Sequence, residues 1–429
     1  MSMKQLKTTL IYILFSMLST FSMSLYILAD TFFIAYGVGP TGIAALNVVL
    51  PVYNLLFAIS LMIGIGSATL YSLHKENHAS IFSSSIRLAI YIGIAFTMAG
   101  TFFSKEIVIL LQGNDAVIPY ASTYVRILLY YAVFFMLNNV ITPFVRNDHN
   151  PKLASFAMIV ASFSNIILDY ILIIHFNLGM AGAAIATGIS PIISLAILYR
   201  HRFFKQRTVT MAKQPLQKYP LSLVSQGGIG ALIIELSSGI TIIAINTYLF
   251  ALSDESSVAI YGIIANVSLV IIGLFVGIGQ GIQPIISSLH RDQRHKEKSH
   301  SLLLALAIAL LIASLLNLAH GLFPNILSSI FLSSNPELAN QLAEAAQLYF
   351  PSFVFAGINI VIVSYFQAML LSKPGILITM LRGAIGTLLI LPIAAHFFGL
   401  QGIFLTVTLV ESVAFILSGI LIKLHLKKI

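Results

Sequence analysis

The 429-residue chain lacks cysteine and tryptophan, and only 9% of its residues are charged. Without cysteine, the chain can form no disulfide and can perform no thiol chemistry. Without tryptophan, the interfacial aromatic residues of a membrane protein would have to be tyrosine and phenylalanine. A soluble protein of this length needs far more surface charge to stay in solution, so the composition excludes an ordinary soluble globular protein.

Long apolar runs take the place of the missing charge. Hydrophobic residues make up 58% of the sequence, and its mean hydropathy is +0.96. Residues 301–319 hold no charged side chain, over a length that crosses the ~30 Å hydrocarbon core of a bilayer as one helix. The sequence therefore predicts an all-α polytopic membrane protein. Its twelve transmembrane helices are expected near residues 10–36, 43–73, 84–103, 117–145, 153–176, 180–200, 221–251, 257–289, 300–321, 338–372, 375–397 and 400–424.

The basic residues favour one orientation of these helices. The chain has 23 Lys and Arg residues and a formal net charge of +9. With both termini in the cytoplasm, all of the basic residues except Lys105 and Arg126 fall in inner segments, as the positive-inside rule requires. Topology thus explains the basic charge, and nucleic acid is not expected as a partner.

The polar connection at 200–220 divides the chain into halves that repeat each other. The segment 61–77 resembles 274–293, since both contain Gly-Ile-Gly followed by Ser-Leu-His. The segment 177–187 resembles 397–407, about 220 residues later. Six helices in each half predict parallel repeats, related by an axis along the membrane normal.

The expected organisation is therefore two six-helix lobes, related by pseudo-two-fold symmetry around a central cavity that would hold the substrate. The N-lobe is expected at 1–200, a cytoplasmic linker at 201–220 and the C-lobe at 221–429. Histidines in the expected inner loops should be solvated, and they form no metal-binding set. They are His74, His78, His149, His201, His290, His295 and His300.

Four acidic residues lie within the expected transmembrane helices, namely Asp30, Asp169, Glu235 and Glu411. A carboxylate at the bilayer centre costs ~2.5–3.5 kcal/mol on insertion scales, so such a group faces the bundle interior and is a functional candidate. Asn165 and Asp169 are four residues apart and therefore share one helix face. The alternative for each acid is a structural contact that holds neighbouring helices together.

Three stretches resemble the multidrug and toxic compound extrusion (MATE) family, in particular its bacterial members. The first, at 29–52, contains Asp-Thr and a Gly-rich turn, which resemble the end of the family's helix 1. The second, SNIILDYILIIHFNLGMAGAAIATGIS at 164–190, resembles its Asn-x-x-x-Asp and Gly-x-x-Gly-Ala-Ala signature. The third, GIGQGIQPIISSLH at 277–290, resembles its helix 8 motif. The chain departs from the family at 10–28, where many members have a proline, and at the helix 8 exit, which reads Ser-Leu-His-Arg-Asp.

The resemblance implies a cation-coupling site in the N-lobe at Asp30, Asn165, Asp169 and Thr187. The chemistry of these residues agrees, because two carboxylates, an amide oxygen and a hydroxyl suit a hard cation or a shared proton. Two close carboxylates in a low dielectric cannot both stay ionised, so one of them should carry a proton. No cofactor is expected besides H⁺ or Na⁺ as the coupling ion, and no metal besides Na⁺ at these residues.

Weaker candidates for substrate or accessory contacts lie on other helices. Tyr124 resembles a tyrosine near the family's cation site, with an interfacial anchor as the alternative. Glu235 lies in the first helix of the expected C-lobe and Glu411 in its last, and a packing contact is the alternative for both. Other polar residues that could line the cavity are Asn47, Asn54, Gln280 and Gln283.

Together with the resemblance, these observations favour a secondary active antiporter, not an enzyme. It would export amphipathic, mostly cationic organic compounds in exchange for H⁺ or Na⁺ by alternating access, as a monomer in the lipid bilayer of a bacterial plasma (inner) membrane. The alternative within transporters is a lipid-linked oligosaccharide flippase of the same superfamily. The alternative from another class is a membrane-embedded lipid enzyme, which would need a reactive His-Asp or Asp-Asp set at an interface.

The orientation is testable because the chain has no native cysteine. A cysteine introduced at position 208, in the basic connection, is expected to resist membrane-impermeant thiol reagents in intact cells. Labelling of this cysteine from outside would overturn the topology derived from the basic residues.

Overall fold

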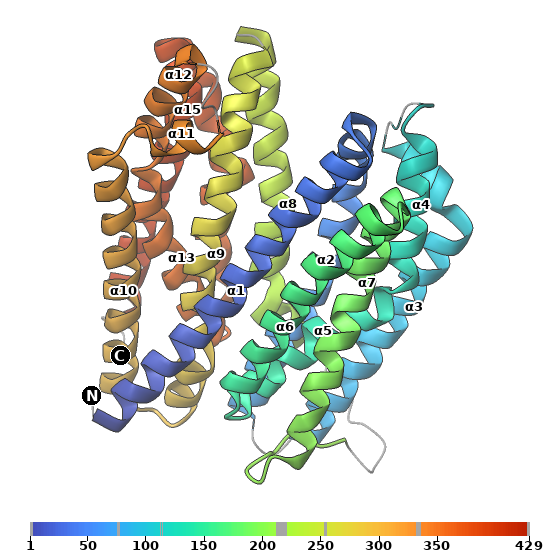
Figure 1. Cartoon of the computed structure of the whole chain (residues 1–429). Coiled ribbons are helices and arrows are strands. Elements are labelled where there is room, and N and C mark those ends of the chain that lie inside the picture. Colours follow the sequence, from blue (N-terminus) through green and yellow to red (C-terminus); the bar gives the residue numbers. More distant parts are fainter. Residues whose placement is uncertain are drawn as a thin grey trace. The chain divides into compact units, whose positions relative to one another are not determined.

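The computed structural model describes residues 3–74, 78–111, 113, 115–211, 221–252, 255–331 and 336–426. In these residues the regular secondary structure consists of helices, and they contain no strand (Figure 1). Outside the described residues lie Lys75, Lys213, Lys218, Lys427 and Lys428 of the basic-residue count, together with 212–220 of the expected linker.

The helices follow the order of the expected transmembrane segments, and several are longer than expected. The first half of the chain contains α1 (Met3–Gly37), α2 (Pro40–Leu73), α3 (His78–Leu110), α4 (Ile118–Tyr130), α5 (Ala132–Asn147), α6 (Pro151–Asp169), η2 (Tyr170–His175), α7 (Gly179–Leu198) and η3 (Tyr199–Phe203). The second half contains α8 (Leu221–Leu252), α9 (Glu255–Arg291), α10 (His295–Leu322), α11 (Ile326–Phe331), α12 (Pro336–Tyr349), α13 (Ser352–Ala368), α14 (Ser372–Arg382) and α15 (Ala384–Leu426).

Twelve membrane crossings follow from these helices. Nine helical segments in the described part of the chain are long and apolar enough to cross a membrane. Two further crossings are bent pairs, α4 with α5 at 53° and α12 with α13 at 42°. The last of the nine segments, Ser372–His425, spans 54 residues and contains Gly399 at φ 57° and ψ −135°, so it forms two crossings joined at a kink. The twelve helices expected from hydropathy are thus confirmed.

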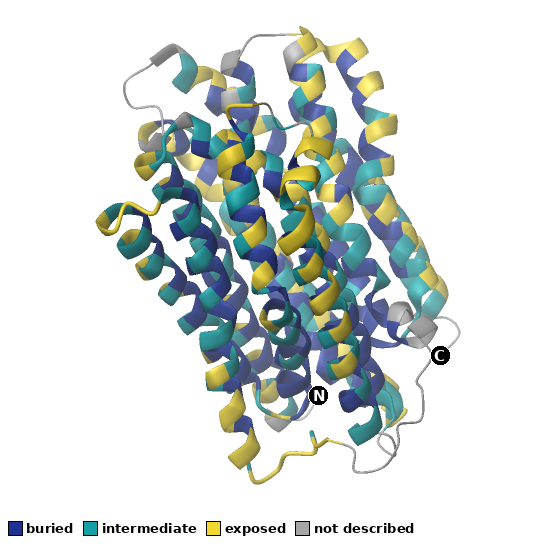
Figure 2. Ribbon diagram, turned by 90° about the vertical axis from the view of Figure 1, so that its right-hand side faces the viewer, coloured by how far each residue is buried: buried dark blue, intermediate teal, exposed yellow. Residues whose placement is uncertain are grey.

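Many outward-facing positions on these helices are apolar. Figure 2 shows exposed positions alternating with buried ones along the helices. On α10, for example, Leu303, Leu310, Leu311, Leu315 and Leu318 are large hydrophobic residues with exposed side chains. Apolar surface on this scale is stable when it contacts lipid or another apolar partner, which agrees with a membrane location.

The chain forms two compact units whose boundaries lie inside helices. The first unit, here called the N-lobe, comprises residues 18–235, and the second, the C-lobe, comprises 1–17 and 236–429. Both α1 and α8 therefore begin in one unit and continue in the other. The boundaries expected from the sequence lie instead in the connection between the halves, at 200 and 221.

Glycines explain why the beginnings of α1 and α8 pack where they do. A Cβ at Gly281 of α9 would lie 2.7 Å from the Cα of Ile13 in α1, within the C-lobe. A Cβ at Gly228 of α8 would overlap the backbone carbonyl of Met62 in α2, within the N-lobe. Helix backbones approach this closely only where no side chain intervenes. Relative to the expected lobes, the two units have therefore exchanged the first part of their first helix.

Backbone breaks occur at corresponding places in the two lobes. The helices α4 and α5 meet at Tyr131, and α12 and α13 meet next to Pro351. Gly179 and Gly399 both adopt a positive φ, of 52° and 57°, which is strained for any residue with a Cβ. The members of each pair are 220 residues apart, the offset of the internal sequence repeat. The repeat read from the sequence is therefore present in the backbone of each lobe.

A buried polar cluster ties residues 208–209 to the N-lobe. Asp148 accepts hydrogen bonds from the backbone N–H groups of Thr208 (2.9 and 2.8 Å) and Val209 (3.0 Å), and from the Thr208 hydroxyl (2.7 Å). His201 Nε2 lies 2.8 Å from Asp148 Oδ2, and the Tyr71 hydroxyl donates to Oδ1 at 3.2 Å. Burial alone would raise the pKa of Asp148, but the hydrogen bonds from His201, Thr208 and Val209 hold it well below its usual value.

This cluster corrects the expectation that the inner-loop histidines are solvated. His201 is buried against Asp148, and His78 stacks on Tyr71 with ring centroids 3.9 Å apart. The expectation for His201 was wrong because Asp148, in the connection between α5 and α6, binds hydrogen-bond donors from residues far away in the sequence. Since the Thr208 hydroxyl belongs to the cluster, the exposed Gln206 is a better position for the topology cysteine.

We expect Asp148→Asn to destabilise the protein at pH 7 by about 1–3 kcal/mol, because several buried donors lose a charged acceptor. A carboxylate whose folded-state pKa is depressed stabilises the fold above its unfolded-state pKa of about 3.9 and loses this contribution as the pH falls toward the folded value. The Tm difference from wild type should therefore stay constant between pH 7 and about pH 5 and shrink below about pH 4.

Thermal unfolding of the detergent-solubilised protein across this pH range tests the role of Asp148. Asp115→Asn, the same substitution at an exposed residue, is the matched control and should leave Tm unchanged. A Tm difference for Asp148→Asn that persists unchanged into strong acid would contradict an ionised, hydrogen-bonded Asp148.

Candidate cation and substrate site

Helix α6 ends at the acidic residue of the Asn-x-x-x-Asp motif. Asp169 is its last residue, and the π-helical segment Tyr170–His175 follows directly. A π-helical turn is rare and occurs frequently at functional sites. Asn165 and Asp169 are both completely buried. The pattern read from the sequence thus marks a buried face, and the structure adds a change of helix type at its acidic end.

Asn165 links Asp169 to the next transmembrane helix. In the amide orientation that satisfies both of its polar groups, Asn165 Nδ2 donates to Asp169 Oδ2 at 3.1 Å, and its Oδ1 accepts from the Thr187 N–H at 3.3 Å. Thr187, on α7, is buried as well. Three of the four residues expected at the cation-coupling site are therefore adjacent in the N-lobe.

Asp30 joins this group from α1. Phe33, one turn further along α1, makes an edge contact with Tyr170 of the π-helical segment, with ring centroids 6.2 Å apart. Asp30 is buried and lies within electrostatic range of Asp169. In the described part of the chain, Oδ1 of Asp30 and Oδ1 of Asp169 have no hydrogen-bond partner. Buried carboxylate oxygens of this kind are costly unless they take up a cation or a proton.

Three tyrosines surround the two acids. The hydroxyls of Tyr26 and Tyr53 are 2.9 Å apart. Tyr26 and Tyr124 both lie within electrostatic range of Asp30 and Asp169. Tyr124 is buried, whereas an interfacial anchor would remain partly exposed. Tyr124 was among the residues expected near the site, whereas Tyr26 and Tyr53 were not, because tyrosine in an apolar helix is common and carries no signal by itself.

Glu235 belongs to the N-lobe unit, whereas it was expected in the C-lobe. It lies on α8 at the end of the N-lobe unit and within electrostatic range of Tyr53. The assignment was wrong because it took α8 as the start of a new lobe, although the first part of α8 packs in the N-lobe. The Tyr26–Tyr53 hydrogen bond connects the surroundings of Glu235 to those of Asp30.

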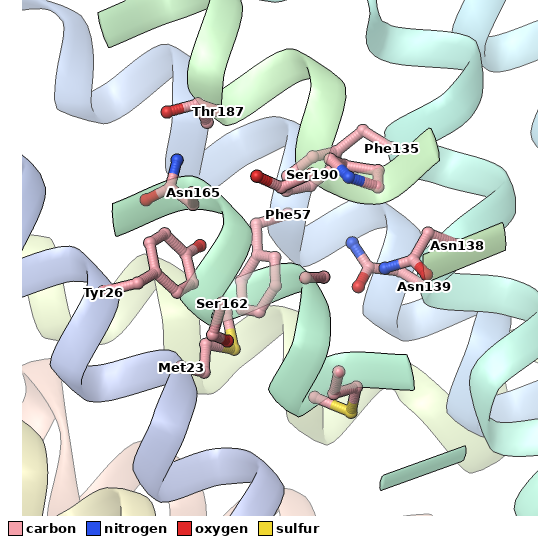
Figure 3. A pocket seen from close by; sticks show the side chains of 13 residues that line it. Met23, Tyr26, Phe57, Phe135, Asn138, Asn139, Ser162, Asn165, Thr187 and Ser190 are labelled. Atoms are coloured by element: carbon pink, nitrogen blue, oxygen red, sulfur yellow. The ribbon is translucent and has the colours of Figure 1, made fainter. Parts of the chain in front are cut away.

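A cavity of about 60 Å³, with both polar and apolar side chains in its wall, adjoins the acid cluster within the N-lobe. Asn165 and Thr187 line one side, and Figure 3 shows Asn138 and Asn139 on another. Ser162, Ser190 and Tyr26 add further polar groups to the wall, next to Met23, Met158 and Phe135. Asn138 and Asn139 were not among the expected site residues, although two adjacent asparagines inside an apolar helix were a usable signal.

Comparison with known proteins identifies the family of this chain. The MatE family model matches residues 16–171 and 229–392. The chain belongs to the MatE family. It is 23% identical over 423 residues to the multidrug export protein MepA of Staphylococcus aureus, and the alignment covers 95% of this chain and 91% of MepA. The resemblance to MATE transporters is thus confirmed, and the MatE chain is a multi-pass membrane protein of a transporter family.

Solved MATE structures share the fold of this chain. An outward-facing multidrug resistance MATE family transporter of the MOP superfamily has a TM-score of 0.90 at 21% identity and covers 98% of this chain and 96% of its own. A MOP superfamily transporter from Pyrococcus furiosus, described as having a binding pocket of reverse polarity that suggests a different function, has a TM-score of 0.90 at 20% identity and covers the same shares. The MATE fold alone therefore does not define the substrate.

Glu411 of the MatE chain is neutralised by a basic residue inside the C-lobe. Arg382 Nη2 lies 2.7 Å from Glu411 Oε1, and both side chains are largely buried. Asn359 Nδ2 donates to Glu411 Oε2 at 2.7 Å, and Ser418 donates to Asn359 Oδ1 at 2.8 Å. These contacts match the packing alternative for Glu411. They also give Arg382, which the basic-residue count placed in an inner segment, a buried partner.

The remaining candidates of the MatE chain lie apart from the cavity. Asn47 and Asn54 are on α2, and Asn47 is exposed. Gln280 and Gln283 are on α9 in the C-lobe, where Gln283 is buried. None of the four is among the described residues that line the N-lobe cavity. Their role as substrate contacts stays a prediction.

We expect Glu411→Gln to destabilise the protein by about 3–5 kcal/mol, because it leaves Arg382 buried without its counter-charge. The double variant Glu411→Leu with Arg382→Met should recover much of this loss, since an apolar replacement of a buried ion pair is often neutral. Thermal unfolding of the wild type and both variants in detergent measures the effect. A double variant no more stable than Glu411→Gln would show that the two charges do not compensate each other.

Proposed function

We propose that this MatE chain is a secondary active antiporter that exports amphipathic, mostly cationic organic compounds in exchange for H⁺ or Na⁺. The observation that carries the proposal is the buried pair Asp30 and Asp169, each with an unpartnered carboxylate oxygen beside the Asn165–Thr187 contact. The substrate class is supported by the relative MepA, which is named a multidrug export protein.

The acid pair suits a coupling cation for electrostatic reasons. Two ionised carboxylates in a low-dielectric interior repel each other, so the pair gains free energy when it takes up one positive charge. A proton can bind to either acid, and Na⁺ can use the oxygen atoms of Asp30, Asp169 and Asn165. The donor set thus accepts either cation, and transport measurements have to distinguish them.

Binding of the cation drives transport only if it favours one conformation over the other. A ligand shifts a conformational equilibrium by no more than its difference in affinity for the two states. Cation binding from outside would stabilise the state that releases the drug, and by reciprocity drug binding would weaken cation binding. In this scheme, cation binding at Asp30 acts on α1, a helix that belongs to both units.

A lipid-linked oligosaccharide flippase of the same superfamily is the alternative transporter. Such a protein would bind anionic lipid phosphates, for which basic side chains at the substrate site are the natural partners. The N-lobe cavity has no basic residue in its lining among the described residues, and the acid pair lies next to it. The charge of this region favours a cationic or neutral compound over a phosphate.

A membrane-embedded lipid enzyme is the alternative from another class. It would need a reactive acid–base pair, and the His201–Asp148 contact is the His-Asp pair that the described residues contain. Both oxygens of Asp148 are occupied by backbone and hydroxyl donors of Thr208 and Val209. His201 Nδ1 in turn lies 3.3 Å from Asn150 Nδ2. This saturated cluster has a structural explanation and does not favour an enzyme.

We expect Asp169→Asn and Asp30→Asn each to abolish ion-driven ethidium transport, because each keeps the size of the side chain and removes its charge. Proteoliposomes with an imposed Na⁺ gradient, or with an imposed pH gradient, measure the effect and identify the coupling ion. Glu235→Gln should instead change substrate preference or apparent affinity while ion dependence remains. Asp115→Asn, at an exposed residue, is the control.

A double-mutant cycle separates these roles further. Asp30 and Asp169 should show strong coupling, because they respond to the same cation, and each should couple only weakly to Glu235. Gradient-driven transport by Asp169→Asn, together with uncoupled transport by Glu235→Gln, would reverse the assignment of the coupling site.

A further inference from the structure

The segment that follows α7 combines exposed basic and aromatic side chains. The apolar helical segment Gly179–Phe203 is long enough to cross a membrane, so its last residues lie where the crossing ends. The positive-inside rule assigns this end to the cytoplasm. Residues 199–207, here called the basic segment, therefore border the inner leaflet of the membrane. The segment exposes four basic side chains, namely Arg200, Arg202, Lys205 and Arg207.

No acidic residue of the surrounding sequence neutralises the basic segment. Residues 170–234 contain neither Asp nor Glu. In the described part of the chain, none of the four basic side chains forms an ion pair. The basic connection before α10 differs, because Arg291 pairs with Asp292 and Arg294 pairs with Glu297. The positive-inside rule explains why both connections are basic, but it does not explain why the basic segment lacks acids.

Two exposed aromatic rings accompany the basic side chains. Tyr199 is 58% exposed and Phe203 is 74% exposed, and their ring centroids lie 6.4 Å apart. The Arg202 guanidinium lies 5.7 Å from the centre of the Tyr199 ring and donates to the Tyr199 hydroxyl. Tyrosine is enriched at the interface between membrane and water, and phenylalanine beside Arg and Lys is typical of segments that bind there. The aromatic rings thus favour a lipid surface as the partner of this charge.

Contacts to the N-lobe fix the backbone of the basic segment. His201 is buried with its Nε2 atom 2.8 Å from Asp148, and Thr208 donates to the same carboxylate through its N–H and its hydroxyl. Between these points, the Phe204 N–H donates to the His201 carbonyl at 3.0 Å, and the Arg207 N–H donates to the Phe204 carbonyl at 3.2 Å. Because the backbone is ordered before any ligand binds, binding costs little conformational entropy.

We propose that the basic segment is a binding surface for the headgroups of anionic phospholipids in the inner leaflet. The basic side chains contact the lipid phosphates, and each arginine can donate two hydrogen bonds to one phosphate. The rings of Tyr199 and Phe203 enter the boundary between the headgroups and the acyl chains. Each basic residue near an anionic membrane surface strengthens binding by about fivefold. This inference goes beyond the proposed antiport function and does not depend on the coupling ion.

The absence of native tryptophan makes a site-specific test possible. In the full-length variant Phe203→Trp, the single indole is quenched by a brominated lipid that contacts the basic segment. The variant is reconstituted into liposomes that contain either brominated phosphatidylglycerol or brominated phosphatidylcholine. We expect phosphatidylglycerol to quench at an about tenfold lower mole fraction than phosphatidylcholine. The preference should be weaker at about 1 M NaCl than at about 0.1 M, because salt screens exposed charges.

Variants in the Phe203→Trp background test which charges cause the preference. Arg200→Gln with Arg202→Gln should reduce the preference for phosphatidylglycerol by about fivefold or more. Arg291→Gln with Arg294→Gln is the matched control, since it removes two arginines from the other basic connection, and it should keep the preference within about twofold. If the first pair fails to fold, Lys205→Gln with Arg207→Gln tests the same segment and should give the same loss.

Several outcomes would contradict the proposed lipid surface. Equal quenching by both lipids would overturn it, and so would a preference that survives neutralisation of the basic segment. An equal loss in the Arg291 and Arg294 control would assign the preference to the total inner charge instead of this segment. An indole that neither lipid quenches would place the segment in water. A fluorescence change on addition of polyphosphate would in that case assign the surface to a soluble polyanion.

Discussion

The cost of burying a carboxylate in a low-dielectric interior governs the polar architecture of both lobes. An isolated buried charge is several kcal/mol less stable than the same charge in water, so it needs a counter-charge or a proton. In the C-lobe, Arg382 supplies a permanent counter-charge to Glu411. Asp30 and Asp169 make no ion pair with a basic side chain in the described part of the N-lobe. They therefore need another source of positive charge, and the proposed antiport function assigns this role to the coupling cation.

The two lobes therefore share a repeated backbone and differ in how the charges of their buried acids are neutralised. The bends between α4 and α5 and between α12 and α13 are retained, and so is the positive φ at Gly179 and Gly399. What differs is a few side chains at the helix junction, where Ser162 and Pro191 in the N-lobe correspond to a basic and an acidic residue in the C-lobe. The ion pair fills its junction, whereas the equivalent junction of the N-lobe contains a cavity.

Helix α1 connects this local chemistry to both units. It runs without proline from Met3 to Gly37, belongs to the C-lobe up to residue 17, and carries Asp30 in the N-lobe. Close packing at Gly281 holds its beginning in the C-lobe. Under the proposed function, a change of charge at Asp30 acts on a helix that belongs to both units.

Most of the fold could be predicted from hydropathy, the distribution of basic residues and short motifs. The twelve crossings could be predicted because each needs only a long apolar run, and the Asn165–Asp169 contact because residues four apart on a helix share a face. The Asp148–His201 cluster, the Arg382–Glu411 pair and the lobe of Glu235 could not be predicted. Each depends on which segments, 29 to more than 100 residues apart, come to lie together.

The sequence by itself thus determined that this protein is a twelve-helix membrane protein of the MATE type, with an acidic motif on a buried face of α6. The helices and the buried face are local features, since they follow from hydropathy and helix periodicity along one segment, whereas the MATE type came from the resemblance of three short motifs. Tertiary structure alone decided which acids have a built-in counter-charge, where the lobes divide, and that a cavity lies beside Asn165 and Thr187. Each of these properties depends on contacts between distant segments. The cavity, for example, arises where α1, α2, α5, α6 and α7 meet, and so belongs to no single segment.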